Sequence, residues 1–152
     1  MLRLRLAAVI AAVAVATACG DGPTPGADDA GDGAARTELS LAVSWGEALV
    51  AGEPVTWSLT VTNDGAPVTL QFRSGQQGDV VLTTDDGSEA YRWSADRSFT
   101  AALVEQPVGA GASETFELAE DELDVEPGSY RLTATVPSDP PVPPVEETVT
   151  VG

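Results

Sequence analysis

Histidine and lysine are absent from the 152-residue sequence, and cysteine occurs once. Without histidine, neither a Ser-His-Asp triad nor a Cys-His pair can form, and no metal site can use an imidazole ligand. A single cysteine excludes an internal disulfide bond and a four-cysteine zinc site. Serines are frequent, but the chain lacks the histidine or lysine that would activate one as a nucleophile. We therefore expect no catalytic residue, no metal site and no cofactor, and we interpret the protein as a non-enzyme.

Positive charge is scarce as well. Seven basic residues stand against 24 acidic ones, the formal net charge is -17 and the pI is about 4.1. Such a chain repels phosphates, which excludes a nucleic-acid partner. The acidic side chains gather most densely in residues 117–126, where no feature places two carboxyl groups in an apolar pocket. We therefore interpret this run as a solvated charged loop rather than an acid–base pair.

The one continuous apolar run lies near the N-terminus and is short. It covers residues 6–18, follows Arg3 and Arg5, and has Thr17 as its only polar residue. It is too short to span a hydrocarbon core of about 30 Å, but its length is typical of a secretory signal. The small residues that precede Cys19 resemble a bacterial lipobox. We predict that residues 1–18 are a signal peptide and that Cys19 is lipidated; the alternative is a chance cysteine in an ordinary cleaved signal.

The next segment predicts a tether. Residues 19–36 consist mainly of Gly, Pro, Ala and Asp and contain no large apolar side chain. They cannot bury enough surface to offset the entropy lost on ordering, so we expect a disordered linker. We expect the protein to be held in the cell membrane by its lipid anchor, with the folded domain on the extracytoplasmic face.

From residue 37 onward, apolar and polar residues alternate. Such period-two patterning puts one face of a strand on a core and the other in water. The runs predict strands over residues 39–45, 55–62, 68–72, 79–84, 89–94, 99–104, 114–118, 129–136 and 146–151. Together with the turn-forming residues between them, they predict an all-β antiparallel sandwich or barrel over residues 37–152. The core candidates are Leu41, Trp57, Leu59, Leu70, Phe72, Trp93, Phe99, Phe116, Tyr130 and Leu132.

Several motifs in the middle of the chain resemble a known family when they are taken together. Residues 61–103 contain a Thr-Asn turn followed by PVTLQF, then SGQ shortly before Asp79, then DGSEAYRWS, then Phe99 with Ala-Ala-Leu. Further on, a glycine-rich turn precedes Glu-Thr-Phe in residues 109–116, and residues 127–132 read PGSYRL. In this order the motifs resemble the intracellular proteinase inhibitor (BsuPI-like) family over nearly the whole predicted domain.

The resemblance implies an antiparallel immunoglobulin-like β-sandwich that inhibits a subtilisin-type serine protease. Gly78 departs from the family pattern, which tends to have an aromatic residue at this position. The export signal is a second departure, because the family is named for an intracellular inhibitor. We therefore expect the partner to be an extracytoplasmic serine protease, and we expect the protein to be a monomer held on the membrane by its lipid.

The polar residues just before Asp79 are the candidate partner-binding site, together with a turn at residues 95–98. The candidates are Ser74, Gly75, Gln76, Gln77 and Arg97. The two glutamines can donate and accept hydrogen bonds with a protease backbone, and the arginine offers a cation on an otherwise acidic surface.

A structural interpretation of the same region stays open. Gly75 and Gly78 permit a tight turn, and Asp79 accepts backbone hydrogen bonds. By the same reasoning, Arg92 pairs with a carboxylate and Trp93 anchors the chain in the core or on a sheet face.

Two function classes remain. The first is a surface-anchored protease inhibitor, which needs an extended loop that fits a protease cleft or a sheet edge that pairs with the enzyme. The second is a non-inhibitory scaffold or adhesion module of the cell envelope. Fold alone does not separate the two classes. A protruding ordered loop favours the inhibitor, whereas a broad apolar patch favours the scaffold.

Overall fold

The computed structural model describes residues 38–152, which form nine strands. The predicted signal peptide, the linker and Cys19 lie outside the described residues. The strands are β1 (Leu39–Ser44), β2 (Val55–Asn63), β3 (Val68–Phe72), β4 (Asp79–Thr83), β5 (Glu89–Arg92), β6 (Val104–Val108), β7 (Ser113–Glu120), β8 (Gly128–Thr135) and β9 (Val145–Val151). Within this part of the chain, no helix of a length and hydropathy suited to crossing a membrane is present.

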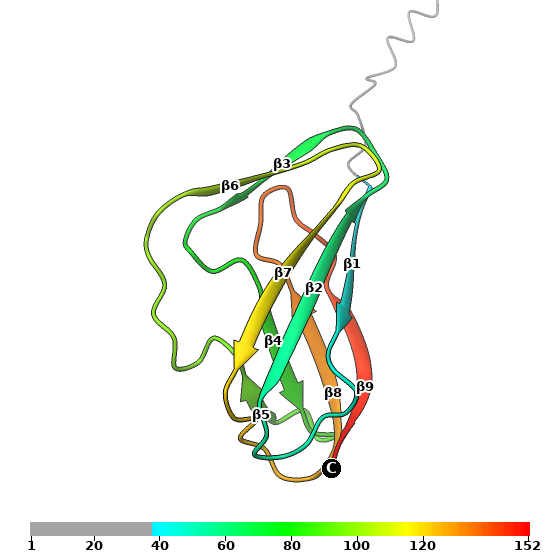
Figure 1. Cartoon of the computed structure of the whole chain (residues 1–152), viewed down its shortest axis with the longest axis vertical. Helices are drawn as coiled ribbons and strands as arrows, with labels where there is room; N and C mark the ends of the chain where they lie inside the picture. Colours follow the sequence, from blue (N-terminus) through cyan, green and yellow to red (C-terminus); the bar gives the residue numbers. More distant parts are fainter. Residues whose placement is uncertain (1–37) are drawn as a thin grey trace, which may run out of the picture. The chain divides into compact units, whose positions relative to one another are not determined.

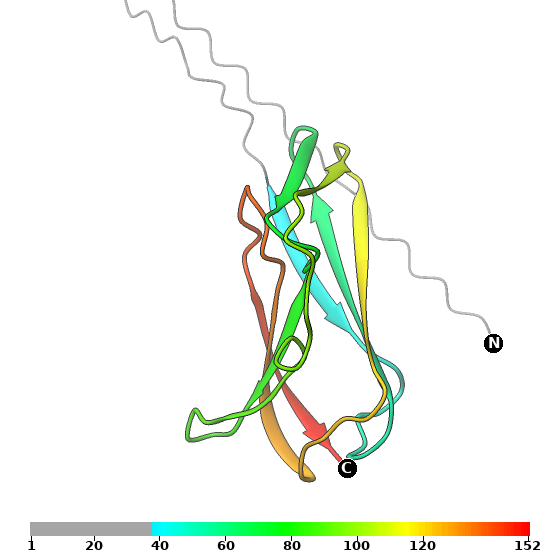
Figure 2. The same cartoon turned by 90° about the vertical axis from the view of Figure 1, so that its left-hand side faces the viewer.

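Two antiparallel sheets face each other across the domain (Figures 1 and 2). The first sheet has the order β1-β2-β7, and the second has the order β5-β4-β8-β9. An arrangement with β2 beside β7 in one sheet and β4, β8 and β9 side by side in the other is that of an immunoglobulin-like sandwich. The Tyr130 hydroxyl, near the start of β8, donates to the Glu126 carbonyl at 2.7 Å, which is the tyrosine corner of such folds. The predicted fold class is confirmed.

A bent two-stranded ribbon extends the first sheet. Beyond the end of the β2–β7 pairing, the segment after β2 and the segment before β7 bend together. They pair again as β3 with β6. The fully buried side chain of Asn63 holds this bend, because its Nδ2 donates to the carbonyls of Ala66 at 2.7 Å and of Val108 and Gly109 at 3.2 Å each. Its Oδ1 accepts from the Gly65 amide at 3.0 Å, so both ends of the amide have partners.

The core lies between the two main sheets and follows the predicted alternation. In β2 the buried and less buried positions alternate along the whole strand, with Trp57, Leu59 and Val61 fully buried. Of the core candidates, Trp57, Leu59, Leu70, Phe72, Phe116, Tyr130 and Leu132 are buried, whereas Leu41, Trp93 and Phe99 are only partly buried. Leu41 belongs to the edge strand β1, in which Leu39 and Val43 on the same face are buried.

One predicted strand is wrong. Residues 99–103 form no strand, and β6 begins at Val104, which pairs with Phe72. The strand extends through Pro107, a residue without an N–H donor, which is tolerated because β6 pairs on one side with β3 alone. Phe99 packs instead against Trp93, with ring centroids 5.8 Å apart. The connection between β5 and β6 is therefore longer than the sequence pattern indicates.

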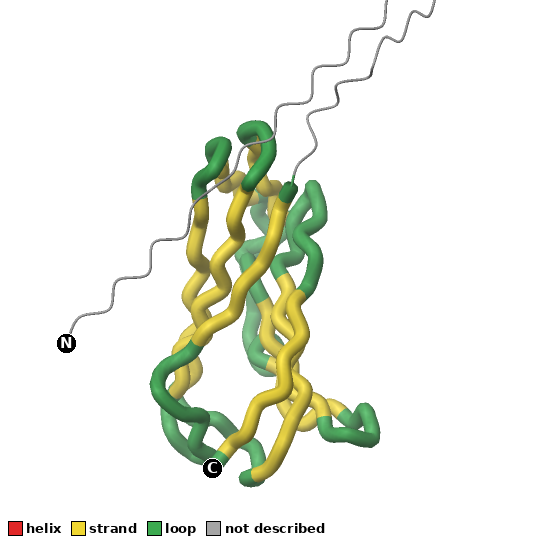
Figure 3. Tube along the Cα trace, turned by 90° about the vertical axis from the view of Figure 1, so that its right-hand side faces the viewer, coloured by secondary structure: helices red, strands yellow, loops and turns green. Residues whose placement is uncertain are grey.

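The two ends of the sandwich differ. The β4–β5 hairpin projects away from the two sheets at one end of the domain. Figure 3, which views the domain from the side opposite to that of Figure 2, shows this projection. The connection from β5 to β6 runs along one side of the domain and joins the two ends (Figures 1 and 2). This connection and the chain beside it contain the candidate site.

Candidate functional site

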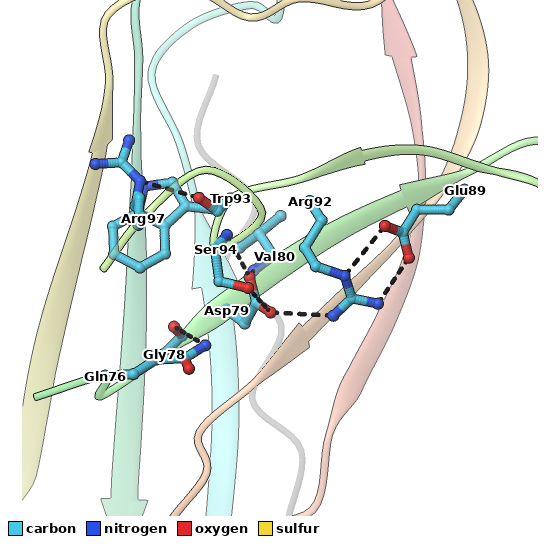
Figure 4. Close-up of polar contacts among 9 residues, drawn as sticks. All are labelled: Gln76, Gly78, Asp79, Val80, Glu89, Arg92, Trp93, Ser94 and Arg97. Atoms are coloured by element: carbon cyan, nitrogen blue, oxygen red, sulfur yellow. Dashed lines mark hydrogen bonds and ion pairs between the residues drawn. The ribbon is translucent and has the colours of Figure 1, made fainter. Parts of the chain in front are cut away.

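Asp79 connects two of the sequence motifs. It is the first residue of β4, and its buried carboxylate accepts four hydrogen bonds (Figure 4). Oδ1 accepts from the amides of Val80 at 3.0 Å and Ser94 at 3.1 Å, and Oδ2 accepts from the Ser94 hydroxyl at 2.7 Å and from Arg92 Nη1 at 3.1 Å. The carboxylate thus ties the start of β4 to the end of β5. The expected role of Asp79 as a backbone acceptor is confirmed.

Arg92 bridges Asp79 to a second carboxylate. Its Nε and Nη2 donate to the two oxygens of Glu89 at 3.1 and 2.7 Å. These bonds raise the pKa of the Arg92 guanidinium and lower the pKa of the Glu89 carboxyl. The predicted pairing of Arg92 with a carboxylate is confirmed, and it fixes the end of β5 from which the long connection departs.

Trp93 and Arg97 clamp the start of that connection onto the edge of β7. The carbonyl of Ala119 in β7 accepts from Trp93 Nε1 at 3.0 Å and from Arg97 Nη2 at 2.8 Å. Arg97 Nε also donates to the Trp93 carbonyl at 2.9 Å, and its guanidinium lies 4.3 Å from the centroid of the Trp93 ring. The clamp bridges the two sheets, because Trp93 follows β5 and Ala119 belongs to β7.

Glu120 completes the clamp. Its Oε2 accepts from Arg97 Nη2 at 3.2 Å and from the Tyr91 hydroxyl at 3.0 Å. Burial of the Tyr91 hydroxyl raises its pKa. Arg97 is therefore not a free cation, and its contact with a partner stays a prediction. Its charge is paired with Glu120, and its side chain is 35% exposed.

The predicted loop at residues 74–78 packs closely against the same connection. The Gly75 amide donates to the Thr100 carbonyl at 2.9 Å, and a Cβ on Gly75 would lie 2.8 Å from Thr100 Oγ1. Gly78 is buried, and a Cβ there would lie 3.0 Å from Leu59 Cδ2. Neither glycine has a positive φ. Gly75 lies in a bend at residues 73–75, as the turn interpretation predicts, and Gly78 lies outside it. Close packing against Thr100 and Leu59 disfavours a larger residue at the two positions.

The candidate residues face two separate hollows. Arg97 lines a hollow of about 510 Å³ whose other lining residues include five acidic side chains, namely Glu89, Asp96, Glu120, Glu122 and Asp124. Ser74 and Gln76 line a second hollow of about 330 Å³ beside Arg73 and Asp139. Ser74, Gln76 and Gln77 are half-buried rather than exposed. Within residues 38–152, no three acidic or cysteine side chains gather as a metal site would require.

Sequence reasoning missed the segment that follows the clamp. Residues 97–103 run without a turn or bend, and Leu103 is 63% exposed, the highest value among the large apolar side chains of the described chain. The signal was present, because residues 101–104 read Ala-Ala-Leu-Val and do not alternate with polar residues as a half-buried strand does. An ordered and exposed segment without a turn or bend therefore leads into β6.

These features define the class of protein. It is an immunoglobulin-like sandwich in which the long β5–β6 connection is held along one edge by the clamp. The sequence then places it more narrowly, since it matches the family described as BsuPI, intracellular proteinase inhibitor, over residues 45–140. The chain belongs to this family. The match includes the Asp79 cluster, the clamp and the exposed segment. No curated protein matches the chain.

Among solved structures, the chain is similar to the CARDB domain of the PF1109 protein from Pyrococcus furiosus, with a TM-score of 0.44, 15% identity, and coverage of 76% of this chain and 89% of that one. It is also similar to the sporulation control protein Spo0M from Bacillus subtilis, with a TM-score of 0.46, 14% identity, and coverage of 74% and 49%. A β-glucosidase from Listeria innocua gives a TM-score of 0.43 and 19% identity, with coverage of 76% and 16%.

Proposed function

We propose that this domain inhibits a subtilisin-type serine protease outside the cytoplasm. Membership of a proteinase inhibitor family supports a protease as the partner. The predicted export signal in residues 1–18 supports an extracytoplasmic target. In this role the domain binds the enzyme without supplying a catalytic residue of its own.

The observation that carries the proposal is the exposed segment at residues 97–103. It is ordered by the clamp before it and by β6 after it, and it lies along the surface of the domain. The described residues include only two large apolar side chains that are exposed, Val50 and Leu103. Two exposed apolar side chains are too few to form the broad apolar patch expected of a scaffold, so the described surface favours the inhibitor.

The proposed contact surface keeps the candidate residues, with revised roles. Gly75 lies beside the exposed segment, since its amide donates to the Thr100 carbonyl, and Ser74, Gln76 and Gln77 flank Gly75 in the sequence. The glutamine amides border the contact and donate to the enzyme backbone. Arg97 contributes indirectly, because it holds the start of the segment against β7.

The proposed anchor gives the inhibitor a defined reach. Removal of residues 1–18 takes away Arg3 and Arg5 and changes the formal charge from -17 to -19. The strong negative charge keeps the domain away from an anionic lipid surface. Residues 19–36, as a flexible chain, have an end-to-end distance of about 24 Å. A domain lipidated at Cys19 therefore acts on proteases close to the membrane.

The inhibitory activity is tested with a fragment of residues 33–152. The fragment includes all of the described residues, 38–152, and the buried core is built from residues 39–151, so the fragment contains the whole described fold. We expect stoichiometric inhibition of subtilisin-type proteases and none of cysteine proteases. Failure against a broad panel of subtilisin-type enzymes contradicts the proposal and leaves the scaffold interpretation.

The anchor is tested separately in cells with a fatty-acid analogue. We expect the wild-type protein to be labelled and the Cys19→Ser variant to remain unlabelled. Equal labelling of both proteins contradicts lipidation at Cys19 and leaves the inhibitory activity untouched.

A further inference from the structure

The exposed segment has main-chain groups that nothing in the described structure occupies. The Thr100 carbonyl accepts from Gly75, but the amides and carbonyls of Ala101, Ala102 and Leu103 form no hydrogen bond within residues 38–152. Exposed main chain in an extended conformation adds readily as a strand to the edge of another protein's sheet. Such an addition supplies hydrogen bonds along the chain and leaves alternate side chains to enter pockets.

The side chains along the segment have the sizes that this kind of binding needs. Thr100, Ala101 and Ala102 are small and exposed, so they leave room for an approaching enzyme strand. Leu103 follows them as a large apolar side chain that is 63% exposed. Single exposed apolar residues are common and need no special role. Leu103 differs because it ends a run of main chain that has no turn or bend and whose groups at residues 101–103 form no hydrogen bond within residues 38–152.

From these two observations we infer that residues 100–103 bind in the protease cleft as a substrate does, with the Leu103 side chain in an apolar primary specificity pocket. The inference rests on the proposed function and names the site through which it acts. The side chain of Leu103 loses its exposed apolar surface on binding, which is the contribution expected of an anchor residue.

The fold holds the segment on both sides of Leu103. Upstream, the Gly75 amide holds the Thr100 carbonyl at 2.9 Å, and Arg97 is fixed on β7. Downstream, Val104 pairs with Phe72 in the β3–β6 ribbon. The entropy of ordering the segment is therefore largely lost on folding rather than on binding, which favours affinity. The same restraints keep both sides of Leu103 in place, as an inhibitor that is not consumed requires.

The test replaces the anchor side chain in the fragment of residues 33–152. Leu103→Glu puts a charge into an apolar pocket, and we expect inhibition of a subtilisin-type protease to weaken by about 30-fold or more. The matched control is Val50→Glu, which changes the other exposed large apolar side chain. We expect this control to inhibit as well as the wild type. Both variants should unfold at the wild-type urea midpoint, because both positions are exposed.

A third variant tests for a gain rather than a loss. Leu103→Arg should weaken inhibition of the subtilisin-type protease and create inhibition of trypsin, whose primary pocket accepts a basic side chain. Trypsin inhibition absent from the wild type identifies residue 103 as the specificity determinant, even if the binding surface extends further.

The outcomes separate this inference from the proposed function. If the wild-type fragment inhibits and Leu103→Glu inhibits equally well, the assignment of Leu103 is overturned while the proposed function stands. If Leu103→Glu and Val50→Glu weaken inhibition equally, the assignment is likewise overturned. A wild-type fragment that inhibits no subtilisin-type protease overturns the proposed function, and this inference with it.

Discussion

Removal of the Asp79 carboxylate should disconnect the base of the exposed segment from the sandwich. In the Asp79→Ala variant, the amides of Val80 and Ser94, the Ser94 hydroxyl and Arg92 Nη1 lose their acceptor. The two amides are the costly groups, because they lie in a buried or half-buried region. Arg92 loses less, since its side chain is 40% exposed and keeps both bonds to Glu89.

The expected loss follows from these contacts. A hydrogen bond to a charged acceptor contributes about 1.5–3 kcal/mol, and the amides of Val80 and Ser94 make two such bonds. The exposed ion pair with Arg92 adds about 0–1 kcal/mol. We therefore expect Asp79→Ala to lower the free energy of unfolding by about 3–7 kcal/mol. Asp79→Asn keeps one acceptor oxygen and the side-chain volume, so its loss should be smaller.

The assay is urea unfolding of the fragment of residues 33–152, followed by tryptophan fluorescence. Asp85→Ala is the matched control, because it removes an exposed carboxylate from the turn after β4. We expect the control to change the free energy of unfolding by less than about 0.5 kcal/mol. Equal losses for Asp79→Ala and Asp85→Ala would refute the assigned role of the buried carboxylate.

Three further perturbations test the corner of the ribbon, the core and the β4–β5 turn. Asn63→Ala should lower the free energy of unfolding by about 2–4 kcal/mol, because three carbonyls lose their donor, and Asn63→Asp should lower it more. Gly78→Ala should lower it by about 1–3 kcal/mol through crowding against Leu59. Urea unfolding measures both losses, and wild-type midpoints would contradict them. Hydrogen bonds from Thr84 and Ser88 lower the pKa of Asp86 to about 2. The ionised Asp86 carboxylate therefore stabilises the folded state above the unfolded-state pKa near 3.8. This stabilisation is lost as the pH falls towards 2. Thr84→Ala should raise the pKa in an NMR titration, and an unchanged value would contradict the assignment.

The main strands and the buried faces could be predicted from the sequence because burial imposes a period of two on them. The alternation through β2 identifies Trp57, Leu59 and Val61 as core residues, and all three are fully buried. Periodicity does not reveal the edge strand β6, because its residues, Val-Glu-Gln-Pro-Val, do not alternate in polarity although their burial alternates. Its pairing with β3 depends on the bend at Asn63, which brings together residues far apart in the chain.

The candidate site was predictable only where a side chain has an obvious partner. A carboxylate for Arg92 follows from charge alone, but its identity as Asp79 and Glu89 depends on how β4 and β5 pair. Arg97 defeats sequence reasoning for a different reason. Its shortest hydrogen bond is to the main-chain carbonyl of Ala119. Every residue has such a carbonyl, so the sequence cannot identify this partner.

The central claim is that residues 100–103 enter the protease cleft, and hydrogen–deuterium exchange measures this most directly. The amides of Ala101, Ala102 and Leu103 have no hydrogen-bond acceptor within residues 38–152, so they should exchange fast in the free fragment. A subtilisin-type protease whose catalytic serine is replaced by alanine binds the fragment without cutting it. We predict strong protection of these three amides in that complex. Fast exchange at all three, with protection confined to another face of the sandwich, would contradict the account.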